Sequence, residues 1–322
     1  MASDNVVHAI AGAGGGMVSM ALTYPLVTVS TRAQVAKAPT SATSATSTSA
    51  KKPESVWAAQ KDAFVKIIRE EGVVGLYSGV ESAMFGIAVT QGVYYYFYEG
   101  VKAAFEAAQE AERSISTVES MAAGAIAGAA TSLITNPIWV VNVRQTVKKS
   151  SLDSDNTKSL TIRQTIAKIY KEEGITGFWK GIIPALILVI NPIIQYTTFE
   201  KLKDLLQQRR TAKGQGALTG FDFFLLGALS KLAATSITYP YIVVKSRMQL
   251  KQSDNDKERY NNVLDGIRKI IKNEGIKGLY KGIEAKLLQS VLASAFTFAF
   301  KEELYNSAVT LLVLLKLREA AK

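Results

Sequence analysis

The sequence predicts an all-α membrane protein. We expect six transmembrane helices in three repeats related by a pseudo-threefold axis, each repeat with a short amphipathic helix on the matrix or lumen side. Two observations predict this class. Hydrophobic residues make up 48% of the chain, which is high for a soluble protein, and two short motifs recur three times at nearly equal intervals. The alternative is a soluble protein with long buried helices, but such helices would normally carry polar stripes.

The predicted spans are stretches with few or no charged side chains. Spans of about 17–25 apolar residues match the hydrocarbon core of a bilayer. The stretches are residues 5–31, 82–98, 120–143, 181–199, 223–244 and 287–300. Only Lys231 interrupts the fifth stretch, and the sixth is the shortest.

The first recurring motif is a proline inside an apolar run, followed seven residues later by an arginine. A proline in mid-helix removes one backbone hydrogen bond and kinks the helix. We therefore expect three equivalent kinks that bend three helices toward one axis. The prolines are Pro25, Pro137 and Pro240.

The second motif is a Glu-Gly pair that ends a short amphipathic helix and precedes the next span. The pairs begin at Glu71, Glu173 and Glu274. Together the motifs divide the chain into repeats at residues 1–110, 111–212 and 213–322. Residues 38–53 form a low-complexity Ser/Thr/Ala segment, which we expect to be a disordered loop within the first repeat.

The composition argues against several classes of function. The chain has no cysteine and a single histidine, His8, so we expect no catalytic residue, no metal and no bound cofactor. A membrane-embedded enzyme would need catalytic groups in one cavity, whereas the carboxylates are scattered. The net charge of +11 lies in loops that flank the spans, which favours contact with lipid head groups over nucleic acid. We expect a monomer without a cleaved targeting peptide.

The motifs resemble the signature of the mitochondrial carrier family. That signature is Pro-x-acid-x-x-basic-x-basic, then an amphipathic helix with acid-Gly-x-x-x-x-aromatic-basic-Gly. The resemblance covers all three repeats and implies a six-helix solute carrier that alternates between the two sides of an organelle membrane. "NPIWVVNVR", "TYPYIVVKSRMQ" and "GIEAKLLQSVLASAF" resemble the peroxisomal branch, and the fungal form best.

The peroxisomal resemblance implies a substrate class and a location. It implies a multi-pass protein of the peroxisomal membrane that exchanges adenine nucleotides, ATP for AMP, or nucleotide-like cofactors. The alternative is a mitochondrial inner-membrane carrier for coenzyme A, FAD, NAD or folate. In either case the partner is a small anionic nucleotide or cofactor.

The chain departs from the family signature at the lumen-side gate. Val27, Trp139 and Ile242 replace the acid expected two places after each proline, and only Lys245 keeps the first basic place. We therefore predict a lumen-side gate held mostly by packing. On the cytoplasmic side the resemblance implies a gate with ionic pairs, to which five residues contribute: Glu99, Lys102, Glu200, Lys203 and Glu302.

The resemblance places substrate contacts on the even-numbered spans, about seven residues after the glycine that starts each one. The residues reached in this way, with polar neighbours, are Gly86, Ile87, Gln91, Leu188, Asn191, Gln195 and Gln289. A phosphorylated anion also needs cations, and Lys231 and Lys286 lie inside spans, where an unpaired charge is costly. Snorkelling, or an ion pair between Lys231 and Glu284, would account for Lys231 without a ligand.

Overall fold

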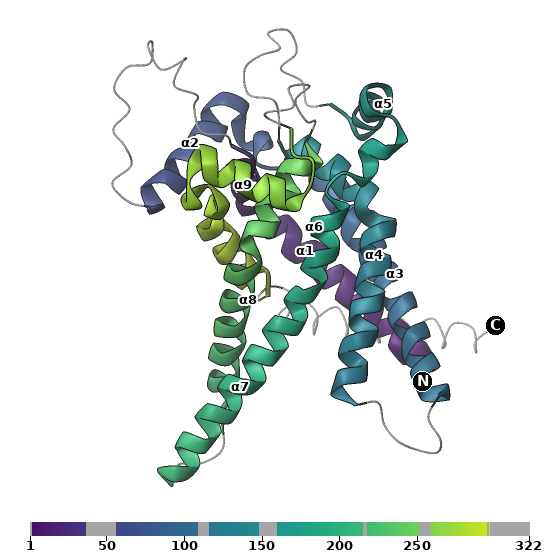
Figure 1. The fold of residues 1–322 in the computed structure, drawn as a ribbon, viewed down its shortest axis with the longest axis vertical. Coiled ribbons are helices and arrows are strands. Elements are labelled where there is room, and N and C mark those ends of the chain that lie inside the picture. Colours follow the sequence, from purple (N-terminus) through teal and green to yellow (C-terminus); the bar gives the residue numbers. More distant parts are fainter. Residues whose placement is uncertain are drawn as a thin grey trace, which may run out of the picture.

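The computed structural model describes residues 2–36, 56–108, 116–147, 160–214, 218–250, 259–294 and 296. All regular elements in these ranges are helical (Figure 1). The first repeat holds α1 (Ala2–Val35), α2 (Val56–Gly75) and α3 (Val80–Ala107). The second holds α4 (Thr117–Thr146), α5 (Ile162–Glu173), α6 (Ile182–Ile187) and α7 (Asn191–Ala212). The third holds α8 (Gly220–Gln249), α9 (Val263–Glu274) and a helix over residues 283–294. The predicted loop at residues 38–53 lies outside the described residues.

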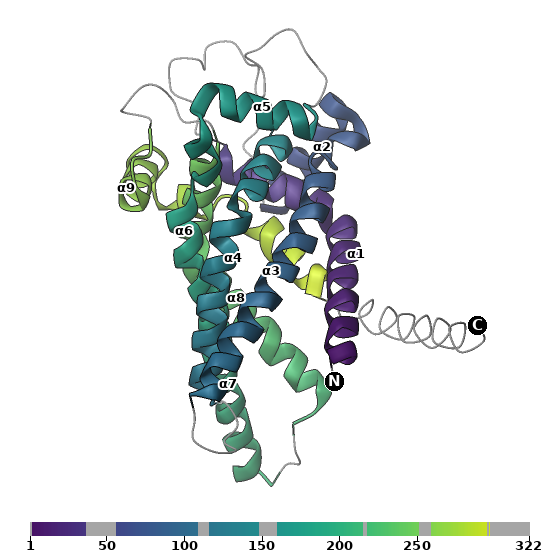
Figure 2. The same ribbon diagram turned by 90° about the vertical axis from the view of Figure 1, so that its right-hand side faces the viewer.

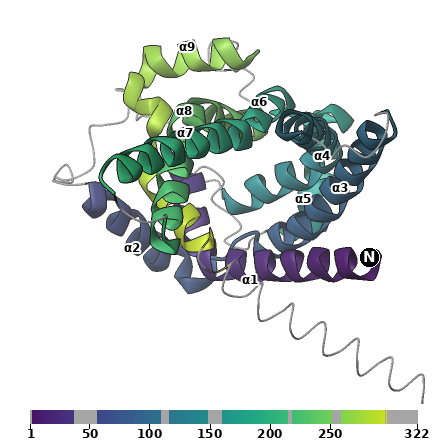
Figure 3. The same ribbon diagram turned by 90° about the horizontal axis from the view of Figure 1, so that it is seen from below.

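The long helices surround a common axis, and the short helices lie at one end of it. Seen along that axis, α1, α3, α4, α7 and α8 surround the centre, with α2 and α9 toward the outside (Figure 3). In the side view α5 lies across the ends of the long helices (Figure 2). We call the end that carries α2, α5 and α9 the basal end. The far ends of α7 and α8 diverge from those of α3 and α4 (Figure 1).

Each amphipathic helix is held to its own proline helix by a small apolar cluster. In the second repeat Ile169 of α5 packs with Val140 and Val141 of α4. In the third, Ile270 of α9 packs with Val243 and Val244 of α8. Burial of these aliphatic side chains, each worth about 1.5–3 kcal/mol, fixes the short helix across the basal end of its repeat.

Three helices are long and apolar enough to cross a membrane within the described residues: Thr117–Thr146, Ile175–Ala212 and Phe221–Gln249. A fourth is added if the pair Lys61–Gly75 and Val80–Ala107, bent by 73°, counts as one span. The predicted spans at 82–98, 120–143, 181–199 and 223–244 fall on these helices. The predicted spans at 5–31 and 287–300 include residues whose side chains lie outside the description. The all-α class with three repeats is confirmed.

The fourth span contains a break that the sequence analysis did not predict. Between α6 and α7 the chain forms a 3-10 turn, Leu188–Ile190, and Pro192 follows in the first turn of α7. Proline has no N–H to donate to the carbonyl four residues earlier, so the helix tightens before it. This turn also sets the position of the predicted contact Leu188.

All three motif prolines lie inside continuous helices, as expected from the sequence. A proline frees the carbonyl four residues earlier, which in a membrane must find another donor. Pro137 frees the carbonyl of Leu133, and the indole N–H of Trp179 donates to it at 3.0 Å. The aromatic residue of the second motif therefore restores a hydrogen bond that the first motif removes.

Candidate functional site

The basal end carries three equivalent ion pairs, each inside one repeat. An arginine seven residues after the proline makes two hydrogen bonds to the glutamate of the Glu-Gly pair, a geometry that gives strong charge-assisted bonds. The first bond is 2.6 Å long in every repeat. The pairs are Arg32–Glu71, Arg144–Glu173 and Arg247–Glu274, and we call these six residues the basal ring.

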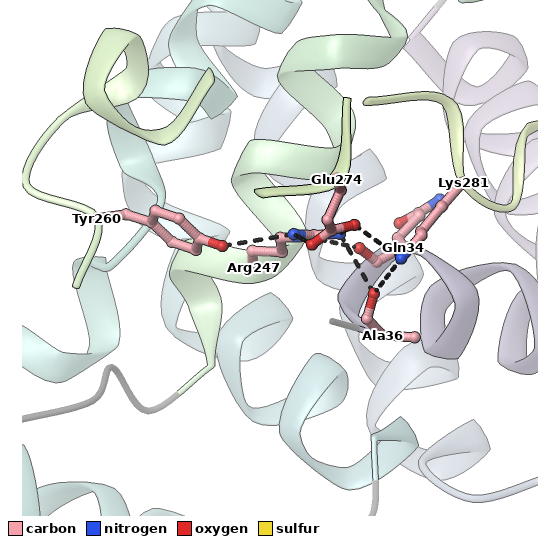
Figure 4. A network of polar contacts seen from close by, with 6 residues as sticks. All are labelled: Gln34, Ala36, Arg247, Tyr260, Glu274 and Lys281. Carbon is pink, nitrogen blue, oxygen red and sulfur yellow. Dashed lines mark hydrogen bonds and ion pairs between the residues drawn. The ribbon is translucent and has the colours of Figure 1, made fainter. Parts of the chain in front are cut away.

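The same arginines also join each repeat to the next. Arg32 Nε donates to the carbonyl of Thr146 at 2.9 Å, and Arg144 Nε donates to the carbonyl of Gln249 at 3.0 Å. Arg247 Nε donates to the carbonyl of Gln34 at 2.9 Å (Figure 4). The three bonds close a cycle from the first repeat to the second, the third and back to the first.

The side chain of the residue before each proline donates a hydrogen bond to the turn that precedes the even-numbered span. Tyr24 donates its hydroxyl to the carbonyl of Ser78, and Tyr239 donates to that of Lys281 at 2.9 Å. Asn136 donates to the carbonyl of Phe178 at 2.8 Å. All three side chains are almost fully buried, so each repeat keeps its two spans in a fixed relation at the basal end.

The glutamates of the second and third repeats have a second cation. Lys180 pairs with Glu173, and Lys281 pairs with Glu274 at 2.7 Å. Burial alone would raise the pKa of each carboxyl, but the hydrogen bonds from arginine and lysine outweigh it and lower the pKa of both. In the first repeat Ser78 stands where these lysines stand.

The prediction of a basal gate held mostly by packing is only partly right. The acids are indeed absent, but neutral hydrogen bonds between repeats take their place. Ser30 donates to the carbonyl of Gly282 at 3.2 Å, and Asn142 donates to that of Gly79 at 2.8 Å. Gln34 donates to the hydroxyls of Ser30 and Tyr239. Amide and hydroxyl groups thus connect the repeats where the family signature would put charges.

The third repeat carries three lysines on α8 and the last helix, two of them on α8. Lys286 is close enough to Lys231 and Lys245 for their positive charges to repel, and its Nζ donates to Gln289 Oε1 at 3.0 Å. None of the three lysines has an acidic partner within the described part of the chain. The alternative ion pair between Lys231 and Glu284 is therefore not formed. Lys245, assigned from the sequence only to the gate, joins this group.

Several other predicted contact residues lie in packing positions. Gly86 is buried against α4, where an added Cβ would lie 3.2 Å from Ile138 Cγ2. Ile87 lies 3.6 Å from the place that a Cβ of Gly16 would take, on α1. Asn191 donates to Thr238 Oγ1 at 2.6 Å, which ties α7 to α8.

The remaining predicted contacts stay predictions. Leu188 and Gln195 are partly buried, Gln91 is exposed, and Gln289 is 7% exposed. The structure thus brings together Lys231, Lys286 and Gln289 from the predicted set. A comparison among the three repeats could have identified Lys245 from the sequence, because the equivalent residues Ser30 and Asn142 are neutral.

The predicted cytoplasmic gate lies at the opposite end, where charges pair within single helices. Lys203 pairs with Glu200 at 2.5 Å along α7. Lys102 pairs with Glu106 at 3.8 Å along α3, and Glu99 of the same helix is partly buried. Glu302 lies outside the described residues.

Comparison with known proteins agrees with this architecture. The chain is 39% identical to the peroxisomal nicotinamide adenine dinucleotide carrier of Arabidopsis thaliana, over 96% of this chain and 98% of the relative. It is 38% identical to the peroxisomal membrane protein PMP47B of Candida boidinii, over 94% and 86%. Identity to the peroxisomal adenine nucleotide transporter 1 of Saccharomyces cerevisiae is 31%, over 79% and 77%.

These relatives are peroxisomal by name, which bears out the predicted location in the peroxisomal membrane. The sequence model of the family described as mitochondrial carrier protein matches residues 2–108, 113–210 and 218–310. With three matches that together span most of its length, the chain belongs to the mitochondrial carrier protein family.

Proposed function

We propose that the protein exchanges adenine nucleotides, ATP for AMP, or nucleotide-like cofactors across the peroxisomal membrane by alternating access. The observation that carries the proposal is the pair Lys231 and Lys286. Both are partly buried cations without an acidic partner in the described residues. Unpaired charge inside a membrane protein is costly and marks a substrate path. A phosphorylated anion would supply the missing negative charge.

The names of the related carriers support a nucleotide-like substrate and indicate two candidates. One relative is named as an adenine nucleotide transporter and another as a nicotinamide adenine dinucleotide carrier. NAD is therefore our second candidate, favoured by the higher identity over nearly the whole chain. Both molecules carry adenosine and at least one phosphate, which the lysines would bind in the same way.

The proposal also covers the class of protein, its oligomeric state and the partners of its basic loops. We propose that it is a transporter and not an enzyme, that it acts as a monomer, and that its basic loops contact lipid head groups and not nucleic acid. Transport by this mechanism requires no bound cofactor. The roles of Gly86, Ile87, Gln91, Leu188, Asn191 and Gln195 as further contacts belong to the same proposal.

Counter-exchange in vesicles tests the function. Purified full-length protein is reconstituted into liposomes loaded with AMP, and uptake of labelled ATP, NAD and coenzyme A is measured in parallel. We expect ATP uptake that depends on internal AMP and falls at least about 10-fold in Lys231→Gln with Lys286→Gln, since each charged contact is worth about 1.5–3 kcal/mol. Uptake of NAD without ATP would transfer the assignment to the second candidate. Uptake of neither would overturn both.

A further inference from the structure

The third repeat departs from the others at the residue five places after the proline. In the first repeat Ser30 at this place donates to the carbonyl of Gly282, and in the second Asn142 donates to the carbonyl of Gly79. The third repeat has Lys245 there. Among the described residues its ammonium group has no hydrogen-bond partner and no acid, although the helix itself packs closely, with the Lys245 carbonyl 3.1 Å from where a Gly181 Cβ would lie.

A second polar group one turn away is also left without a partner. Gln249 is 2% exposed, and its side-chain Nε2 is buried without a hydrogen bond. In the first repeat the equivalent Gln34 Nε2 donates to Ser30 Oγ at 3.1 Å. Lys245 stands where that acceptor would be, and an ammonium group can only donate. The third repeat therefore presents two donors on one helix face and no acceptor for either.

A third donor comes from the last helix. Lys286 is close enough to Lys245 for their charges to repel, and its equivalents Ala83 and Ala185 in the other repeats are uncharged. Buried polar groups are normally satisfied, and two ammonium groups in a membrane interior need negative charge. The missing component is a compact anion with several acceptor oxygens.

We infer that Lys245, Gln249 and Lys286 form a phosphate subsite at the basal end of the third repeat, which takes the terminal phosphate of a ligand with two or more phosphates. Lys231 lies two heptads before Lys245 on the same face of α8, about 21 Å along the helix axis, so the cations form a line rather than one point. A nucleotide with a phosphate chain would reach Lys245 and Lys286 together, whereas a monophosphate would not.

This inference rests on the proposed function for the identity of the cargo, but the anion subsite can be tested without it. Thermal unfolding of the full-length protein in detergent is measured with inorganic pyrophosphate, orthophosphate, ATP and AMP. The decisive variant is Lys245→Asn, because it places in the third repeat the residue that the second already uses. Lys201→Asn is the matched control, since Lys201 is an exposed lysine on α7.

We expect wild type and Lys201→Asn to be stabilised by pyrophosphate and ATP more than by orthophosphate and AMP. In Lys245→Asn the apparent affinity for pyrophosphate and ATP should fall about 10-fold, as for a lost charge-assisted hydrogen bond, with little change for AMP. The ligand-free variant should unfold at the same temperature as wild type or higher, because a neutral amide replaces an uncompensated charge. A merely structural lysine would instead lower that temperature when it is replaced.

Three results would overturn the subsite. They are equal stabilisation of wild type and Lys245→Asn by pyrophosphate, equal stabilisation of wild type by pyrophosphate and orthophosphate, and a ligand-free loss of stability with unchanged ligand response. Lys245→Gln, which keeps more of the side-chain volume, gives the same comparison if the asparagine variant does not fold. If vesicles exchange no nucleotide while pyrophosphate still distinguishes the variants, the proposed function is wrong and the subsite remains.

Discussion

The two ends of the molecule hold their charges in different ways. At the basal end each arginine is bonded to a glutamate of its own repeat and to a carbonyl of the next. At the opposite end, within the described residues, the ion pairs run along single helices or, for Arg210 and Asp222, join consecutive helices α7 and α8. The basal end therefore joins all three repeats in a cycle, whereas at the opposite end the pair Arg210–Asp222 joins the second repeat to the third and the other two pairs stay inside one helix.

This difference indicates which interactions hold the repeats together when the bundle is closed. An ion pair inside one helix cannot oppose the separation of two repeats, whatever its strength. A bond from one repeat to a carbonyl of another must break before those repeats move apart. We therefore expect substitutions at the basal end to change both stability and the balance between open and closed states, and substitutions in the single-helix pairs of the other end to change neither.

The largest effect is expected for Arg247→Ala. Arg247 and Glu274 have only 3% and 5% of their side chains exposed, and removing one partner of a buried pair costs about 3–5 kcal/mol. Thermal unfolding in detergent measures the loss. Arg32→Ala is the matched variant, and its cost should be smaller because Arg32 and Glu71 are 18% and 17% exposed. Equal losses would show that burial does not rank these two pairs.

Acid should weaken the basal ring when its glutamates become protonated. The pKa values of Glu173 and Glu274 lie below their ordinary value of 4.5. A carboxyl with a lowered pKa stabilises the fold fully above that ordinary value, and this stability is lost as the pH falls through the lowered pKa. The unfolding temperature should be level from pH 7 to 5 and fall below about 4.5.

The variant Glu173→Gln distinguishes protonation of the basal ring from protonation of other carboxyls. The variant should lose about 1.5–3 kcal/mol at pH 7, the value of a hydrogen bond to a charged group. It should also lose less stability than wild type between pH 5 and 3, because one titrating group is gone. An acid transition identical to that of wild type would assign the loss to other carboxyls.

A smaller effect is expected for Trp179→Phe. The substitution leaves the Leu133 carbonyl without the indole donor that replaces the N–H missing from proline, at a cost of about 1 kcal/mol. Trp139→Phe is the control, since its indole donates to a hydroxyl, Thr90 Oγ1 at 3.2 Å, which can rotate to another partner. A larger loss for the Trp139 variant would contradict the role given to Trp179.

The smallest effect is expected for Lys203→Gln at the opposite end. Its ion pair with Glu200 lies along one helix, with 27% of the lysine and 33% of the glutamate side chain exposed, and solvent-accessible pairs of this kind contribute little. The unfolding temperature and the rate of exchange in vesicles should both match wild type. A slower exchange would show that Lys203 pairs with another repeat when the opposite end closes.

The sequence predicted the repeats well because their motifs are periodic and chemically distinctive. The proline motif and the Glu-Gly pair recur at fixed places, so the helices at 120–143 and 223–244 follow directly. The break at Leu188–Ile190 was missed, because Pro192 was read as part of an uninterrupted apolar run. Its effect on the hydrogen bonds of the preceding turn depends on local geometry that hydropathy does not report.

The candidate site was predicted less completely. Lys231 and Lys286 stand out as charges in apolar stretches, and the structure places them near one another. The bonds from Arg32, Arg144 and Arg247 to the next repeat could not be predicted, because their acceptors are backbone carbonyls and leave no trace in residue type. Gln249 was missed because an unpartnered amide becomes visible only when its neighbours are placed.

The use of backbone carbonyls as acceptors has a consequence for how such a triplicated chain can diverge. The acceptor residues are Gln34, Thr146 and Gln249, and the ring is complete although one of them is a threonine. Drift at these places leaves the hydrogen bond intact, whereas a change at any of the three arginines removes it. The side chains at the acceptor places can therefore differ among the repeats while the closure that depends on their backbone is kept.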